Sequence, residues 1–128
     1  MLKSLSILLP SYNNDCRPLI TALHSQAEAL GDNLSSYEIV VYDDCSTDTA
    51  KAEANRQLCE SLTHCRFVRG NHNVGRSAAR NRLVELAQHE WLVFIDSDLS
   101  PLPADFLAVY AEADSLGAEA VVGGLKIH

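Results

Sequence analysis

The chain has 128 residues, of which 47% are hydrophobic and 21% charged, and its formal net charge is −7. These values are typical of one folded domain and exclude a disordered chain. The negative charge argues against a nucleic-acid partner, because such partners select basic surfaces.

Strand-like and helix-like patterns alternate along the chain. The strand-like runs are apolar or rich in β-branched and aromatic residues, whereas the helix-like runs repeat apolar residues at helical spacing. The predicted elements, in chain order, are a strand at 5–9, a helix at 18–30, a strand at 37–42, a helix at 48–62, a strand at 65–68, a helix at 77–87, a strand at 91–95, a helix at 103–116 and a strand at 120–122. Gly31 can end the first helix, Asp48 can cap the second and Pro103 can open the last.

Repeated strand–helix units with short links predict an α/β fold of three layers. Its sheet should be mostly parallel, with helices on both faces, as in Rossmann-like folds. In such a sheet, ligands bind beyond the carboxyl ends of the strands. The unusual polar segments of this chain all follow predicted strands, so we expect one domain over residues 1–128 with its site at that edge.

No stretch of the sequence resembles a membrane span or a secretory leader. The longest apolar runs, 7–9 and 91–95, are far shorter than the roughly 20 residues that cross a bilayer. The four cysteines have no C-x-x-C spacing, which favours free thiols over a zinc site or a disulfide. We expect a cytoplasmic protein, either free or peripheral at the inner face of the membrane.

The strongest functional signal is Asp96-Ser97-Asp98, which follows the most apolar strand. Residues two apart in an extended chain point to the same side, and two carboxylates held together repel unless a cation lies between them. Mg²⁺ or Mn²⁺ binds carboxylate oxygens together with substrate phosphates. The triplet therefore predicts half of a metal site that a diphosphate completes; the alternative is a solvated loop.

Asp43 and Asp44 lie at the end of the second predicted strand. A turn followed by a helix cap accounts for Ser46 and Asp48 in part. This alternative does not need two aspartates before the turn. A carboxylate here can accept hydrogen bonds from a nucleobase N–H or from ribose hydroxyls.

A third polar segment runs from Asn73 to Asn81. Gly75 permits a tight loop, and the N-terminus of the following helix can bind an anion. Arg76 and Arg80 share one helix face, and arginine forks suit phosphate oxygens. The alternative is a surface helix on which Arg80 pairs with a neighbouring aspartate and binds no phosphate. A surface role of this kind is a stronger alternative for Arg76 than for Arg80.

Taken together and in this order, the segments 9–13, 38–48, 73–81 and 96–98 resemble the family 2 inverting glycosyltransferases of the GT-A fold. The resemblance covers essentially the whole chain. Two positions depart from the family pattern, because Cys45 stands where glycine is usual and Tyr42 where a small aliphatic residue is more common.

The resemblance implies a nucleotide-sugar site. Pro10, Tyr12 and Asn13 match the loop that lines the base, and Tyr12 can stack on it. Asp44 matches the aspartate that hydrogen-bonds the base, commonly uracil.

The same resemblance assigns the diphosphate end of the site. Arg80 matches the arginine near the base and diphosphate, and Asp96, with Ser97 beside it, matches the aspartate close to the ribose and sugar. Asp98 matches the residue that ligates Mn²⁺ or Mg²⁺, with Asp96 as a second ligand.

The implied activity is transfer of a sugar, with inversion, from a nucleoside-diphosphate donor, most simply UDP. The acceptor would be a sugar, a lipid-linked sugar or a polysaccharide. The general base of this family lies further along the chain, so we expect it beyond His128. Residues 1–128 would then form the donor part, cut before the acceptor part.

Three other functions fit parts of the pattern. The segment 70–77 is one residue from a P-loop, with Arg76 in place of its lysine. The chain can also be a nucleotide-binding module without activity. A receiver domain fits poorly, because Asp15 is a lone acidic residue after the first strand and Lys126 comes too late.

Overall fold

The computed structural model describes residues 4–96, 103–111, 121–122 and 125–126. Within them the strands are β1 (Ser4–Ser11), β2 (Ser36–Asp43), β3 (Cys65–Arg69), β4 (Leu92–Phe94), β5 (Val121–Val122) and β6 (Leu125–Lys126). The helices are α1 (Arg17–Leu30), α2 (Thr49–Ser61), α3 (Arg76–Leu86) and α4 (Phe106–Ala111), with a short 3₁₀ helix η1 (Gly31–Leu34) after α1.

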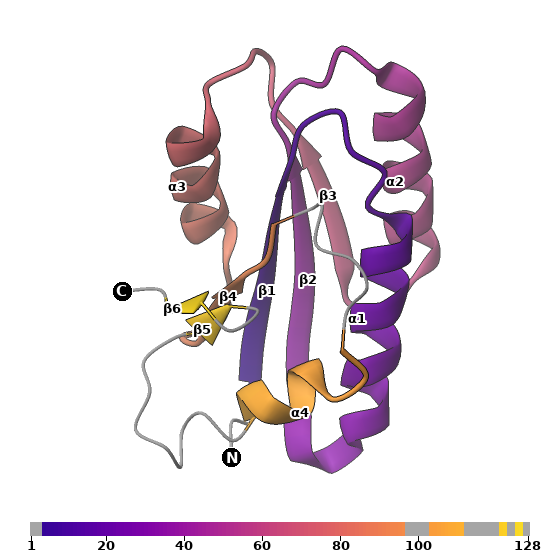
Figure 1. Ribbon diagram of the computed structural model, residues 1–128, viewed down its shortest axis with the longest axis vertical. Coiled ribbons are helices and arrows are strands. Elements are labelled where there is room, and N and C mark those ends of the chain that lie inside the picture. Colours follow the sequence, from indigo (N-terminus) through magenta and orange to yellow (C-terminus); the bar gives the residue numbers. More distant parts are fainter. Residues whose placement is uncertain (1–3, 97–102, 112–120, 123–124, 127–128) are drawn as a thin grey trace.

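The described residues form a four-stranded parallel sheet in the order β3-β2-β1-β4. Figure 1 shows this sheet between α1 and α2 on one side and α3 on the other. The predicted three-layer α/β fold with a parallel sheet is therefore confirmed. The chain moves outward from β1 to β2 and β3, and then returns to place β4 on the opposite side of β1. A reversal of this kind leaves a crevice at the carboxyl ends of the two strands that flank it.

The central strands are apolar because both of their faces are covered. In β1 the residues 7–9 are fully buried, and they pair in register with the equally buried residues 39–41 of β2. Burying an apolar side chain of this size contributes about 2 kcal/mol each. The two runs that predicted these strands thus form the middle of the core.

Helix boundaries follow the predicted signals closely. The Asp48 side chain accepts a hydrogen bond from the Lys51 N–H at 3.2 Å and so caps α2. Gly31 follows α1 with a φ of 53°, a conformation that favours glycine. None of the helices in the described residues is long and apolar enough to cross a membrane.

The end of the chain departs from the prediction. Val121–Val122 is a strand, as expected, but it pairs antiparallel with β6 in a separate sheet and does not join the parallel one. Only two residues separate β5 from β6, and so short a connection can join only antiparallel neighbours. The predicted last helix is represented by α4, which begins at Phe106 and not at Pro103, because residues 103–105 form a turn in which the Pro103 carbonyl accepts from the Phe106 N–H. Positions 112–116 of the predicted helix lie outside the described residues.

The four cysteines are free, as the sequence predicts. Burial raises the pKa of Cys59 to about 12 and the pKa of Cys65 to about 11. Both thiols therefore stay protonated at neutral pH and act as small apolar side chains.

Candidate functional site

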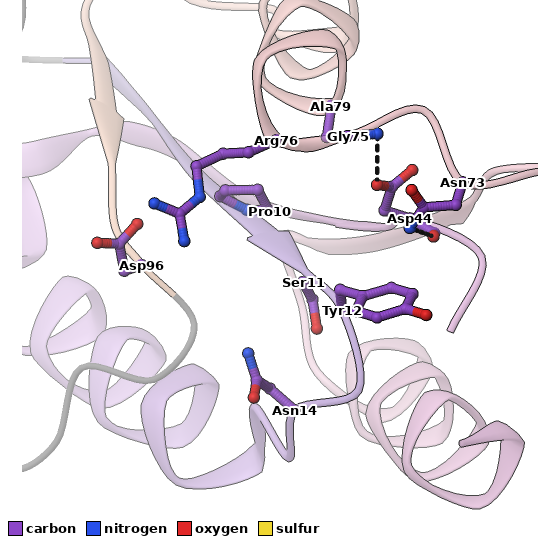
Figure 2. A pocket seen from close by; sticks show the side chains of 10 residues that line it. All are labelled: Pro10, Ser11, Tyr12, Asn14, Asp44, Asn73, Gly75, Arg76, Ala79 and Asp96. Atoms are coloured by element: carbon purple, nitrogen blue, oxygen red, sulfur yellow. Dashed lines mark hydrogen bonds between the residues drawn. The ribbon is translucent and has the colours of Figure 1, made fainter. Parts of the chain in front are cut away.

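A cavity of about 320 Å³ opens at the carboxyl edge of the parallel sheet. Figure 2 shows its side chains converging from the end of β1, the end of β2, the start of α3 and the end of β4. The lining residues are Pro10, Ser11, Tyr12, Asn14, Asp44, Asn73, Gly75, Arg76, Ala79 and Asp96. The edge that the fold class predicts as the binding edge is thus the hollow one.

Pro10 explains why the cavity lies between β1 and β4. The backbone of Ser6 and Leu8 faces β4, since the Ser6 N–H donates to Trp91 and the Leu8 carbonyl accepts from Ile95. Pro10 continues this alternation but has no N–H to donate. The pairing with β4 therefore stops at Leu8, whereas the opposite edge of β1 stays paired with β2 through Ser11. The two strands part, and the space between their ends becomes the cavity.

Asp44 anchors the loop before α3. The residue is only 5% exposed. Its carboxylate accepts hydrogen bonds from the N–H groups of Val74 at 2.9 Å and Gly75 at 3.0 Å. The Asn73 side chain donates to the Asp44 carbonyl at 3.2 Å. The predicted anion site at this helix N-terminus is therefore partly occupied by Asp44 itself. The same contacts weigh against a P-loop, in which such N–H groups cradle phosphates.

Asp43 has a different task from its neighbour. It is fully buried, and its carboxylate accepts from the Ser46 N–H at 2.8 Å and the Ser46 hydroxyl at 2.5 Å. The Arg69 guanidinium lies 3.6 Å away. The turn after β2 thus uses one of the two aspartates, Asp43, and Asp44 is the one left over from it.

The loop after β1 is fastened to the turn after β2. The Asn13 N–H donates to the Ser46 hydroxyl at 2.9 Å, and the Asn13 side chain binds Thr47 and the N–H of Asp48. Asn13 is not among the residues that line the cavity. Its contacts instead hold the neighbouring Tyr12, a residue that is 43% exposed, at the mouth of the cavity.

Cys45 occupies this turn in a strained conformation, with a φ of 56°. A residue with a Cβ loses about 1 kcal/mol there relative to glycine. We expect Cys45→Gly to raise the free energy of unfolding by about 1 kcal/mol, as measured by urea denaturation. Cys59→Gly, at a buried position in the last turn of α2, is the matched control and should destabilise the protein. A Cys45→Gly variant no more stable than wild type would show that the turn carries no strain.

The two arginines of α3 separate in the structure. Arg76 lines the cavity, whereas the Arg80 guanidinium carbon lies 4.6 Å from the centre of the Phe94 ring, within range of a cation–π contact. Arg80 is not among the lining residues. The sequence analysis favoured Arg80 over Arg76 as the residue that binds the nucleotide. The assignment of Arg80 to the nucleotide remains a prediction.

Asp96 is exposed at the edge of the cavity, at the end of β4. Ser97 and Asp98 lie outside the described residues. Among the residues that are described, no group of three or more His, Cys, Asp or Glu side chains could hold a metal ion. Asp96 alone therefore represents the predicted metal site here.

The two charged residues that follow the loop residue Asn14 are paired with each other. The Arg17 guanidinium donates two hydrogen bonds of 2.9 Å to Asp15 in the loop after β1, and this pairing holds the pKa of the Asp15 carboxyl below its usual value. Asp15 does not line the cavity. It is a surface ion pair and contributes little to stability.

Six lining residues were not predicted as site residues, namely Ser11, Asn14, Asn73, Gly75, Arg76 and Ala79. Ser11 and Asn14 flank the predicted Tyr12 and Asn13, so the rule that sites follow strands would have found them. Asn73 and Arg76 lie in the predicted loop and helix start. Which of these side chains turn toward the cavity depends on packing that the sequence pattern does not contain.

Curated relatives share this part of their chains with the protein. It is 32% identical over 96 residues to the uncharacterized glycosyltransferase YibD of Escherichia coli (strain K12), a match covering 73% of this chain and 26% of YibD. It is 28% identical over 116 residues to the succinoglycan biosynthesis protein ExoO of Rhizobium meliloti (strain 1021), covering 89% of this chain and 31% of ExoO. The chain thus spans about a third or less of the length of these relatives.

Solved structures share the fold. S. aureus TarS 1–349 in complex with UDP-GlcNAc superposes with a TM-score of 0.67 at 25% identity, covering 88% of this chain and 31% of the TarS 1–349 chain. The mannosyltransferase PcManGT from Pyrobaculum calidifontis, in complex with GDP-Man and Mn²⁺, gives a TM-score of 0.68 at 25% identity, covering 86% of this chain and 32% of PcManGT.

The resemblance that the four polar segments carry is confirmed by the family comparison. The model of glycosyl transferase family 2 matches residues 6–128, which is nearly the whole chain. Because the match includes every segment that lines the cavity, the chain belongs to glycosyltransferase family 2.

Proposed function

We propose that this chain is the donor-binding part of a glycosyltransferase that moves a sugar from a nucleoside diphosphate to an acceptor. The observation that carries the proposal is the cavity at the carboxyl edge of the sheet. It combines an exposed aromatic ring, Tyr12, with two carboxylates, Asp44 and Asp96, and one guanidinium, Arg76. A nucleotide sugar presents a flat base, hydroxyls and phosphates, and each of these has a suitable partner there.

The base would bind at the Tyr12 end of the cavity. The Tyr12 ring can stack on a nucleobase, and the Asp44 carboxylate can accept one more hydrogen bond from a base N–H. Uracil has such an N–H, so we propose UDP as the nucleotide. TarS, which has a similar fold, binds UDP-GlcNAc.

The diphosphate would lie toward Asp96, with a divalent cation. An exposed carboxylate facing a cavity is a ligand of the kind that Mn²⁺ and Mg²⁺ prefer. We propose Asp98 and Asp96 as the ligands, supported by the Mn²⁺ in the PcManGT complex. A metal bound there would offset the negative charge that develops on the departing diphosphate. Ser97 and Arg80 remain proposed neighbours of the donor.

The reaction we propose is a single displacement at the anomeric carbon, which inverts its configuration. The acceptor hydroxyl loses its proton to a general base, which we place beyond His128 in the whole protein. The acceptor would be a sugar, a polysaccharide or a lipid-linked sugar, a proposal supported by the name of ExoO, a succinoglycan biosynthesis protein. We propose that the protein works in the cytoplasm or at the inner membrane surface.

Thermal unfolding with added nucleotides tests the proposal. UDP at about 100 times its Kd should stabilise the chain by about 2.7 kcal/mol, and only when Mn²⁺ or Mg²⁺ is present. In Asp98→Ala the stabilisation by UDP should no longer depend on the metal. Asp105 is also exposed, and Asp105→Ala should keep this dependence. Equal stabilisation by UDP in EDTA would disprove the metal bridge. Stabilisation by ATP or GTP with Mg²⁺ and none by UDP would favour the P-loop alternative.

A further inference from the structure

The contact between Arg80 and Phe94 fixes how α3 lies along β4. Helix α3 starts at the carboxyl edge of the sheet and runs back along it (Figure 1). Arg76 is four residues before Arg80 and therefore lies about 6 Å closer to that edge. Asp96 is two residues after Phe94, which in an extended chain is about 7 Å closer to the same edge.

These two displacements toward the carboxyl edge, about 6 Å along α3 and about 7 Å along the strand, are nearly equal. Because Arg80 lies beside Phe94, Arg76 should lie beside Asp96. Both Arg76 and Asp96 line the same cavity. Figure 2 shows the Arg76 side chain reaching from the first turn of α3 toward Asp96. A guanidinium and a carboxylate thus approach from opposite walls of the site.

The loop before α3 has already used part of its positive end. The N–H groups of Val74 and Gly75 are hydrogen-bonded to Asp44. Among the lining residues that the structure describes, Arg76 is the one cationic side chain. It is also exposed, so its five N–H donors are available to a ligand.

We propose that Arg76 binds a phosphate of the donor and so sets the strength of diphosphate binding, an inference that rests on the proposed function. A guanidinium fork binds two phosphate oxygens at once. With Asp96 facing it, Arg76 is drawn across the cavity before the donor arrives. Asp96 would hold the proposed divalent cation, which would add positive charge on the wall opposite this guanidinium.

Calorimetric titration of uridine and UDP into the full chain, with Mn²⁺ present, tests the inference. Arg76→Ala should weaken UDP about ten- to hundredfold, the loss expected when a hydrogen bond to a charged group is removed, and leave uridine unchanged. Arg82→Ala is the matched control, because it removes the same charge from the same helix at an exposed residue paired with Glu85. It should change neither affinity. Arg76→Lys should restore part of the UDP affinity, since lysine keeps the charge without the fork.

The outcomes separate the inference from the proposed function. If wild-type protein binds neither uridine nor UDP, the proposed function fails and the inference fails with it. If wild-type protein binds UDP and Arg76→Ala binds it equally well, the inference alone is wrong. It is also wrong if Arg76→Ala weakens uridine as much as UDP, because the residue would then act through the fold and not through a phosphate.

Discussion

Asp43→Ala is expected to lower the free energy of unfolding by about 3 kcal/mol, because it removes a buried carboxylate and leaves the donors of the buried Ser46 without an acceptor. The Ser46 N–H and hydroxyl both lose their acceptor, at 2.8 and 2.5 Å. The Arg69 guanidinium loses its counter-ion at 3.6 Å. Its side chain is 38% exposed, so solvent screens this pair and it adds less than the two hydrogen bonds.

Urea denaturation checks this expectation, with the midpoint falling while the slope stays constant. Asp48→Ala is the matched control in the same loop, because Asp48 caps α2 from a partly exposed position. Loss of that cap should cost about 1 kcal/mol. If Asp43→Ala destabilises the protein no more than Asp48→Ala, the buried carboxylate is not what holds the turn after β2.

Asp43 and Asp44 illustrate what the sequence can predict at this edge. Two aspartates after an apolar strand indicate a site, because parallel strands end at the same edge of the sheet. Neighbouring residues of an extended chain, however, point to opposite sides. Which of the two aspartates points toward the cavity depends on the strand's register. Here Asp43 binds the turn, whereas Asp44 faces the cavity.

The same distinction holds for the fold. The apolar runs predicted the parallel strands because both faces of the sheet are covered, which leaves no polar alternation to confuse the pattern. Val121–Val122 carries no such information, since two residues have no period, and its pairing with β6 is set by the short connection. Likewise, the helical repeat placed Arg76 and Arg80 on one face of α3. Where α3 packs along β4 decides which of them reaches the cavity, and here Arg80 contacts Phe94 while Arg76 lines the cavity.

Asp44→Ala is expected to weaken uridine and UDP alike, by about a hundredfold, since it removes both the proposed contact to the base and the anchor of the loop beside it. The Val74 and Gly75 N–H groups would lose an acceptor at 2.9 and 3.0 Å. Calorimetric titration of the two ligands measures the effect. Asp44→Asn is the matched variant, because its amide oxygen can keep one of the two loop contacts, and it should bind more tightly than Asp44→Ala.

The comparison between Asp44 and Arg76 is what makes the site testable as a whole. A base contact affects uridine and UDP equally, whereas a phosphate contact affects UDP alone. If Asp44→Ala left uridine binding intact and weakened only UDP, Asp44 would act on the phosphates through the loop that it anchors, and the base would have to bind elsewhere. If both ligands weaken together while Arg76→Ala affects UDP alone, the nucleotide lies with its base toward Tyr12 and its diphosphate toward Asp96, the two ends of the cavity.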